Sequence, residues 1–151
     1  MYRTLATPGT LDEMERRLRS IPPDRPARFG RLDAHGMMCH LADIFEAFLG
    51  ERASTPAGNW VLRAFGKYYA LYTPIPWARG VPTRPELDPQ RRGTKPTDFN
   101  ADRERAIAFM RRFAQPDARY GRHAAFGELS RWEWLRWGYR HTLHHLVQFS
   151  A

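Results

Sequence analysis

The stretch Ser130-Arg-Trp-Glu-Trp-Leu-Arg-Trp-Gly-Tyr-Arg-His-Thr-Leu-His-His-Leu-Val-Gln148 decides the fold expected for this chain. Ser130 followed three residues later by Glu133 is a capping box, which marks the start of an α-helix. Residues four apart lie one turn above each other on a helix, so His141 and His145 can direct two imidazoles at one point. A metal ion is the simplest species that such a pair of imidazoles can bind. Because a metal site with an open position usually needs three protein ligands, we expect a third histidine from elsewhere in the chain.

The third histidine is predicted to come from an earlier helix. Asp33 is a suitable N-cap residue, and apolar residues then recur every three or four positions until Gly50 supplies a stop. His40 lies on or beside the apolar stripe of this helix, between Met37 and Ile44. A histidine that is deeply buried there must be either hydrogen-bonded within the core or bound to a ligand.

The spacing of apolar residues predicts further helices over residues 11–21, 60–72 and 102–113. Between the last two, residues 73–97 are rich in proline, and we expect no regular structure there. Unstructured connections of this length are uncommon in compact domains and are often functional. We therefore expect this segment either to shape the mouth of a pocket or to wrap the surface as a simple crossover.

The lack of any strand pattern predicts an all-α fold, a four-helix bundle formed by a single domain over residues 1–151, with an extra short helix in a long crossover. A crossover of about 50 residues would make the second and third bundle helices parallel, and the last helix antiparallel to both. His40 then lies roughly 10 Å from the start of its helix, and His145 and His141 lie roughly 6 and 12 Å from the end of theirs. Because these heights coincide, we predict that His40, His141 and His145 form one metal site.

Composition and charge narrow the classes of protein that fit. The chain has 151 residues and a net charge of +8, and no apolar run approaches the roughly 18 residues of a membrane span. It starts without the layout of a secretory signal, and a single cysteine, Cys39, permits no intramolecular disulfide, so we expect a cytoplasmic protein. The basic residues are scattered rather than gathered into one arm. We therefore favour a solvated charged surface over a nucleic-acid-binding one.

Three segments carry a resemblance to a known superfamily: Arg28-Phe-Gly-Arg-Leu-Asp-Ala-His-Gly-Met-Met-Cys-His-Leu-Ala-Asp43, Phe126-Gly-Glu-Leu-Ser130 and Tyr139-Arg-His-Thr-Leu-His-His-Leu-Val-Gln-Phe149. The chain resembles the DinB-like metal-binding bundles from about residue 11 to residue 149, and is most similar to a bacterial branch known only as a domain of unknown function. The resemblance implies a four-helix bundle, frequent homodimers, and a divalent ion such as nickel or zinc. One histidine of the second helix and a His-x-x-x-His pair of the last helix hold that ion. These positions match His40, His141 and His145 here.

The resemblance also indicates a range of activities. Characterised members of the superfamily include metal-dependent transferases and isomerases that use low-molecular-weight thiols such as bacillithiol or mycothiol, and other members have no assigned activity. It therefore implies a small-molecule substrate and lends no weight to DNA binding, despite the name. This chain departs from the superfamily in the proline-rich residues 73–97, where we expect the pocket specificity to differ. A shared fold does not by itself establish the chemistry.

Several other residues have both a functional and an ordinary interpretation. His144 and Gln148 could support the metal ligands from behind, or could be a surface residue and a cap for a backbone carbonyl. We expect His35 to be exposed or structural and His123 to lie in a loop. Cys39 points about 100° away from the histidine that follows it, which makes it a poor co-ligand, and we expect it to be a buried apolar residue. Three tryptophans of the last helix could stack on an aromatic ligand, but we expect them to belong to the core: Trp132, Trp134 and Trp137.

Three hypotheses follow from the sequence. The first is a small metalloenzyme, a thiol-dependent transferase or a hydrolase, in which the ion activates a thiol or a water molecule. The second is a metal-stabilised binding or scaffold module without turnover. The third is a basic nucleic-acid-binding protein, whose affinity would depend steeply on salt. We favour the first over the second, and both over the third.

Overall fold

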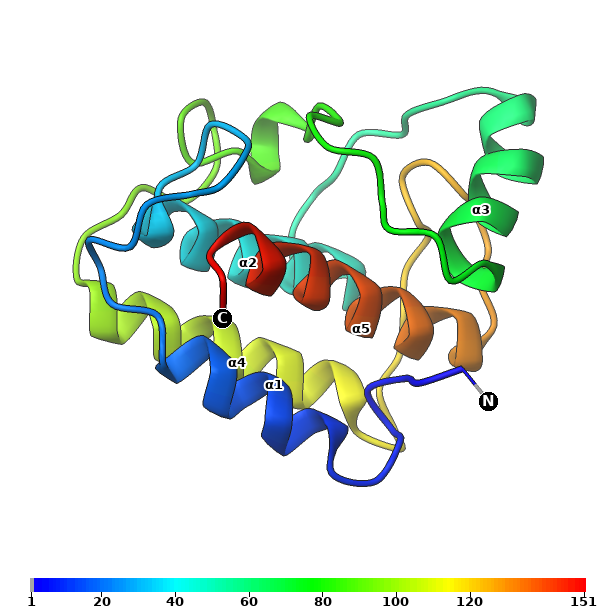
Figure 1. Ribbon diagram of the computed structural model, residues 1–151. Coiled ribbons are helices and arrows are strands. Elements are labelled where there is room, and N and C mark those ends of the chain that lie inside the picture. The colour runs from blue at the N-terminus through cyan, green and yellow to red at the C-terminus, as the bar shows by residue number, and fades with distance from the viewer. Residues whose placement is uncertain (1) are drawn as a thin grey trace.

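The computed structural model describes residues 2–151, and the regular elements in that range are all helical (Figure 1). The predicted helices over residues 11–21 and 60–72 are present as α1 and as η1 followed by α3. Within the described residues, the β-type pairing is limited to an isolated bridge between His123 and Gly127. The expected all-α class is therefore confirmed. The elements follow in the order α1 (Thr10–Arg19), α2 (Ala34–Phe48), the π-helix η1 (Leu62–Gly66), α3 (Lys67–Tyr72), the 3₁₀ turn η2 (Pro85–Leu87), α4 (Phe99–Ala114) and α5 (Arg131–Gln148).

Four helices pack along one another: α2 lies against α4, both contact α5, and α1 packs on α4 and α5. α2 and α4 run in the same direction, whereas α1 and α5 run the opposite way (Figure 1). Because α5 is antiparallel to α2, the last turns of α5 lie beside the first half of α2. This arrangement brings the histidines of these two helices to the same height.

Side-chain caps explain where the helices begin. The Asp33 carboxylate accepts a hydrogen bond from a backbone N–H of the first turn of α2. Ser130 and Glu133 form a full capping box, in which each side chain accepts from the backbone N–H of the other. Both predicted starts are confirmed. The predicted start of α4 at residue 102 is wrong, because Asp98 caps the helix and α4 begins at Phe99.

α5 lies close to its neighbours at Gly138. A Cβ atom at this position would lie only 2.7 Å from Leu5 Cδ1 and 3.1 Å from Phe113 Cε1, and both of those side chains are buried. Glycine therefore permits the close contact between α5 and the core. Two of the three α5 tryptophans are buried as expected, but Trp132 is 38 % exposed, so the prediction that it belongs to the core is wrong. It lies at the surface, against the rings of Tyr2 and Tyr72.

The proline-rich segment is attached at both ends to the helices that carry the histidines. Arg140 of α5 donates hydrogen bonds to the carbonyl oxygens of Thr73 and Ile75. At the other end, the backbone N–H and hydroxyl of Thr94 donate to the buried Asp43 carboxylate of α2, at 2.7 and 2.6 Å. The path of residues 73–97 across the molecule is therefore defined by long-range hydrogen bonds.

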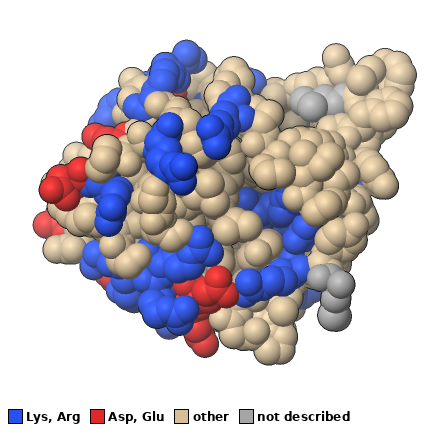
Figure 2. Space-filling model, in the orientation of Figure 1, with Lys and Arg blue, Asp and Glu red and all other residues tan. Residues whose placement is uncertain are grey.

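The surface combines dispersed charge with one uncharged projection. Lys and Arg side chains spread over the face shown in Figure 2 with acidic side chains among them, whereas the projecting end that holds η1 and α3 is largely uncharged. That end exposes Trp60, Phe65 and Tyr68. In the described part of the chain, no helix has the length and apolar character needed to cross a bilayer.

Candidate metal centre

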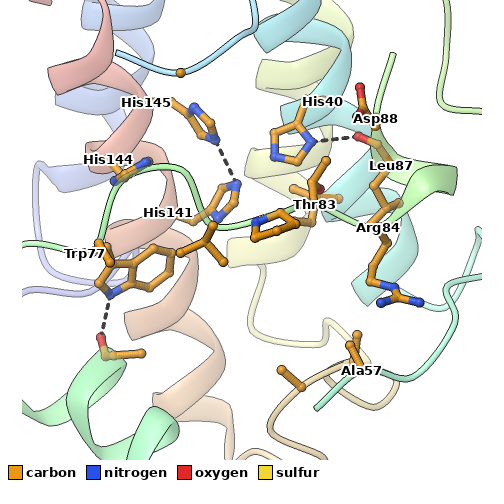
Figure 3. Close-up of a pocket in the computed structure, with 18 of the residues that line it drawn as sticks. His40, Ala57, Trp77, Thr83, Arg84, Leu87, Asp88, His141, His144 and His145 are labelled. Carbon is orange, nitrogen blue, oxygen red and sulfur yellow. Dashed lines mark hydrogen bonds between the residues drawn. The ribbon is translucent and has the colours of Figure 1, made fainter. Parts of the chain in front are cut away.

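His40, His141 and His145 meet between α2 and α5 (Figure 3). One nitrogen from each ring lies within 4.8 Å of the other two, and the Nε2 atoms of His141 and His145 are 3.2 Å apart. The centroid of the His40 ring lies 5.4 Å and 5.1 Å from those of the other two rings. Each residue is less than a tenth exposed. The structure thus brings together the three histidines that the sequence singled out.

Hydrogen bonds behind the rings determine which nitrogen faces the shared point. His40 Nδ1 lies 2.7 Å from the carbonyl oxygen of Leu87, and His145 Nδ1 lies 2.8 Å from Gln148 Oε1. Both partners are acceptors, so each Nδ1 carries the proton and each Nε2 keeps its lone pair. Gln148 is itself held, because its Nε2 donates to the carbonyl oxygen of Phe29 at 2.7 Å. Gln148 therefore contacts both His145 and a backbone carbonyl, so its hydrogen bonds include each of the two arrangements considered for it.

His144 occupies a different place. Its half-buried ring packs edge-on against the His145 ring at 5.4 Å between centroids and lies 5.2 Å from Phe29. It is not one of the three nitrogens that converge. It lines the adjoining cavity, so it is part of the wall beside the cluster.

Burial lowers the pKa of all three clustered histidines. For His40, burial outweighs the hydrogen bond to the Leu87 carbonyl, which acts in the opposite direction. For His141 and His145, burial and then the neighbouring imidazoles hold the pKa well below its ordinary value. Metal ions bind the neutral form of imidazole. Burial therefore favours the neutral form that metal binding requires.

The donor set and its spacing fit a zinc- or nickel-like ion. Imidazole is a common ligand of both metals. Since a zinc–nitrogen bond is about 2.0–2.1 Å long, two nitrogens on one ion lie roughly 3.0–3.4 Å apart. The distance of 3.2 Å between the Nε2 atoms of His141 and His145 falls in this range. The ordinary alternative is a proton shared between these two atoms, which would leave the Nε2 lone pair of His40 without a donor in the cluster.

A cavity of about 690 Å³ opens beside the cluster (Figure 3). Residues 77–91 supply a large part of its wall, which confirms the expectation that the proline-rich segment shapes a pocket. The volume is typical of small-molecule sites. Much of the remaining wall is apolar or aromatic and comes from α2, α3 and α5: Ile44, Phe48, Tyr69, Ala70 and Trp137.

Charged side chains also line the cavity. Three arginines reach it, and Asp88 is the only carboxylate among the described residues that do so. Asp88 pairs with Arg31 at 3.4 Å and with Arg91 at 3.7 Å. Arg84 donates to the hydroxyl of Thr55, which in turn donates to the Glu86 carboxylate at 2.7 Å. The excess of positive charge favours a ligand with an anionic group.

Trp77 is a wall residue that sequence reasoning missed. Its Nε1 donates to the carbonyl oxygen of Ala70 at 3.0 Å, and its ring lies edge-on to His141 at 5.7 Å between centroids. The Trp137 ring also packs on His141, stacked at 4.6 Å between centroids. The signal available in the sequence was a lone tryptophan within a proline-rich segment.

His123 lies in a loop as expected, but it is buried and lines the cavity. Its Nδ1 accepts hydrogen bonds from the backbone N–H groups of Ala125 and Phe126, both at 3.1 Å, so its proton resides on Nε2. Burial lowers the pKa of His123 to about 3. Nothing in the spacing of the sequence identified this position.

The remaining candidates face away from the cluster. Cys39 is fully buried as expected, and burial raises the pKa of its thiol to about 12. His35 is half-buried, and its Nε2 lies 2.7 Å from the Asp102 carboxylate of α4. Both residues lie on the side of α2 that packs against α4.

These observations define an all-helical protein with a buried histidine cluster next to a sizeable cavity. A family model described as "Protein of unknown function (DUF1569)" matches residues 70–151, which is more than half of the chain, and the protein belongs to this family. The matched region contains His141 and His145 but not His40. No curated protein matches the chain, and no solved structure matches it.

Proposed function

We propose that this protein is a divalent-metal-dependent thiol transferase or hydrolase of the DinB-like superfamily, with the four-helix bundle and long crossover of that group, acting on a small molecule. The observation that carries the proposal is the convergence of His40, His141 and His145 beside a cavity large enough for such a substrate. Nickel or zinc held by these residues would supply Lewis acidity, which lowers the pKa of a coordinated thiol or water.

The protein's own residues would prepare the site for this chemistry. The Leu87 carbonyl and Gln148 keep the lone pairs of His40 and His145 directed at the shared point. Trp137 stacks on the His141 ring and limits its rotation. The apolar wall would bind the body of a substrate, and the arginines at the cavity would attract an anionic group on it.

The first test is metal content, measured by inductively coupled plasma mass spectrometry on tag-free protein. We expect His141→Ala to bind about one ion per chain less than the wild type, since two remaining ligands form a weaker site. His144→Ala is the matched control on the same helix, and it should retain the wild-type metal content. Equal metal content in wild type and His141→Ala, after incubation with nickel or zinc, would refute the proposed site.

Turnover is tested next, by screening low-molecular-weight thiols against small electrophiles with wild type and His141→Ala side by side. Metal-dependent product formation that His141→Ala lacks would support the transferase. Hydrolysis without added thiol would support the hydrolase.

A second candidate is a metal-stabilised binding module without turnover. The observation in its favour is that Asp88, the one carboxylate among the described cavity residues, is already paired with two arginines and accepts a hydrogen bond from Gln90 N–H. It is therefore poorly placed as a general base. Metal binding that stabilises the fold, with no turnover for any thiol, would favour this candidate.

A further inference from the structure

A second cluster of potential metal ligands lies on the opposite side of α2. His35 and Cys39 are four residues apart and therefore project from the same face of the helix. Asp102, in the first turn of α4, meets them. One ligand atom from each of the three lies within 4.8 Å of the other two. None of the three is among the residues that line the cavity.

The three donors suit a borderline divalent ion. A thiolate sulfur, an imidazole nitrogen and a carboxylate oxygen are all ligands of zinc and cobalt, whereas magnesium and calcium prefer oxygen alone. His35 Nε2 lies 2.7 Å from Asp102 Oδ2, and Cys39 Sγ lies within 4.8 Å of the ligand atoms of both. An ion would replace the hydrogen that bridges His35 and Asp102, together with the thiol hydrogen of Cys39.

The surroundings orient the cluster and leave one side accessible. The backbone N–H of Thr97 donates to Asp102 Oδ2 at 3.1 Å, and the His35 ring packs edge-on against Phe99 at 5.5 Å between centroids. The His35 side chain is 22 % exposed, whereas Cys39 lies fully buried behind it. Solvent can therefore reach the imidazole side of the cluster, where an ion would enter and a water molecule could complete four-coordination.

We propose that His35, Cys39 and Asp102 form a second divalent-metal site, for zinc or cobalt, with a structural role. The ion would join the first half of α2 to the first turn of α4. Because Thr97 is hydrogen-bonded to Asp102, it would also hold the end of the proline-rich segment whose middle forms the cavity wall.

Cobalt titration of metal-free protein tests this site separately from the histidine cluster. A cobalt–thiolate bond produces a near-ultraviolet charge-transfer band, and Cys39 is the only cysteine in the chain. Three imidazoles produce no such band, so the signal reports the second site whether or not the first one binds. We expect the band to saturate at about one equivalent of cobalt for this site, in both wild type and His141→Ala.

Variants and a second method complete the test. Cys39→Ser should abolish the band. His35→Gln should weaken cobalt binding by roughly tenfold or more, because mutating even a residue that only hydrogen-bonds to a metal ligand lowers metal affinity by at least that factor. Val147→Ala, at an exposed position outside both clusters, should bind as the wild type does. X-ray absorption of zinc-loaded wild type, which needs no variant, should show sulfur at about 2.3 Å. No charge-transfer band and no sulfur neighbour at excess metal would overturn the proposal.

Discussion

Replacing Gln148 by leucine tests how the histidine cluster is held in place. Gln148 accepts a hydrogen bond from His145 Nδ1 at 2.8 Å and donates one to the carbonyl oxygen of Phe29 at 2.7 Å. Leucine fills a similar volume but makes neither bond. The buried Nδ1–H of His145 would lose its acceptor, which costs about 1–3 kcal/mol of unfolding free energy. The His145 ring would also be free to turn, which lowers metal affinity by about 10- to 100-fold.

Two assays separate these effects. Urea unfolding of metal-free protein measures the loss of stability, and competition with a chromophoric chelator measures zinc affinity. Val147→Ala is the control, because this neighbouring side chain is exposed and faces away from the cluster. Wild-type stability and wild-type zinc affinity in Gln148→Leu would refute the role of Gln148. A loss of stability with unchanged affinity would confine that role to folding.

Four further predictions concern stability and the segment that lines the cavity. Burial alone would raise the pKa of Glu133, but hydrogen bonds from Lys67, Ser130 and Tyr72 hold it at about 2, below its ordinary 4.5. The ionised Glu133 side chain thus stabilises the fold fully above pH 4.5, and this stabilisation is lost as the pH falls toward 2. In urea unfolding, the wild type should therefore lose more stability between about pH 7 and pH 3 than Glu133→Gln does, by about 2 kcal/mol. An equal loss in both proteins would contradict this account. Gly138→Val should destabilise the protein by about 1–3 kcal/mol in the same assay, because an added Cβ atom would lie only 2.7 Å from Leu5 Cδ1. An unchanged stability would mean that α5 can shift to make room. Arg140→Gln should speed hydrogen exchange in residues 73–80 by roughly tenfold or more, since the hydrogen bonds to Thr73 and Ile75 are lost, whereas exchange in α1 should not change. Zinc at about 100 times its dissociation constant should raise the unfolding free energy of the wild type by about 2.7 kcal/mol, and at the same concentration His141→Ala should gain less.

The helices were predictable because their signals are local. The capping residues Asp33 and Ser130 were identified from the sequence alone, since a cap acts on backbone N–H groups only two or three residues away. The error at the start of α4 has a local cause as well. Periodicity first becomes visible at residue 102, but Asp98 already caps the helix.

The candidate site was predictable only in part. The pair His141 and His145 follows from helical spacing, and His40 from its height in an antiparallel neighbour. Trp77 and His123 could not be found in this way, because they come from segments without periodicity. Long-range contacts place them, such as the hydrogen bond from Trp77 to the carbonyl oxygen of Ala70.

By itself, the sequence determined the all-helical class, the helix starts at Asp33 and Ser130, and one face of α5 with two histidines a turn apart. Each of these depends on interactions between residues at most four positions apart. Only the tertiary structure decided which nitrogen of each histidine faces the cluster and what encloses the cavity. The tautomer of His40 depends on the Leu87 carbonyl, 47 residues further along the chain, and no local pattern encodes a hydrogen bond over that distance.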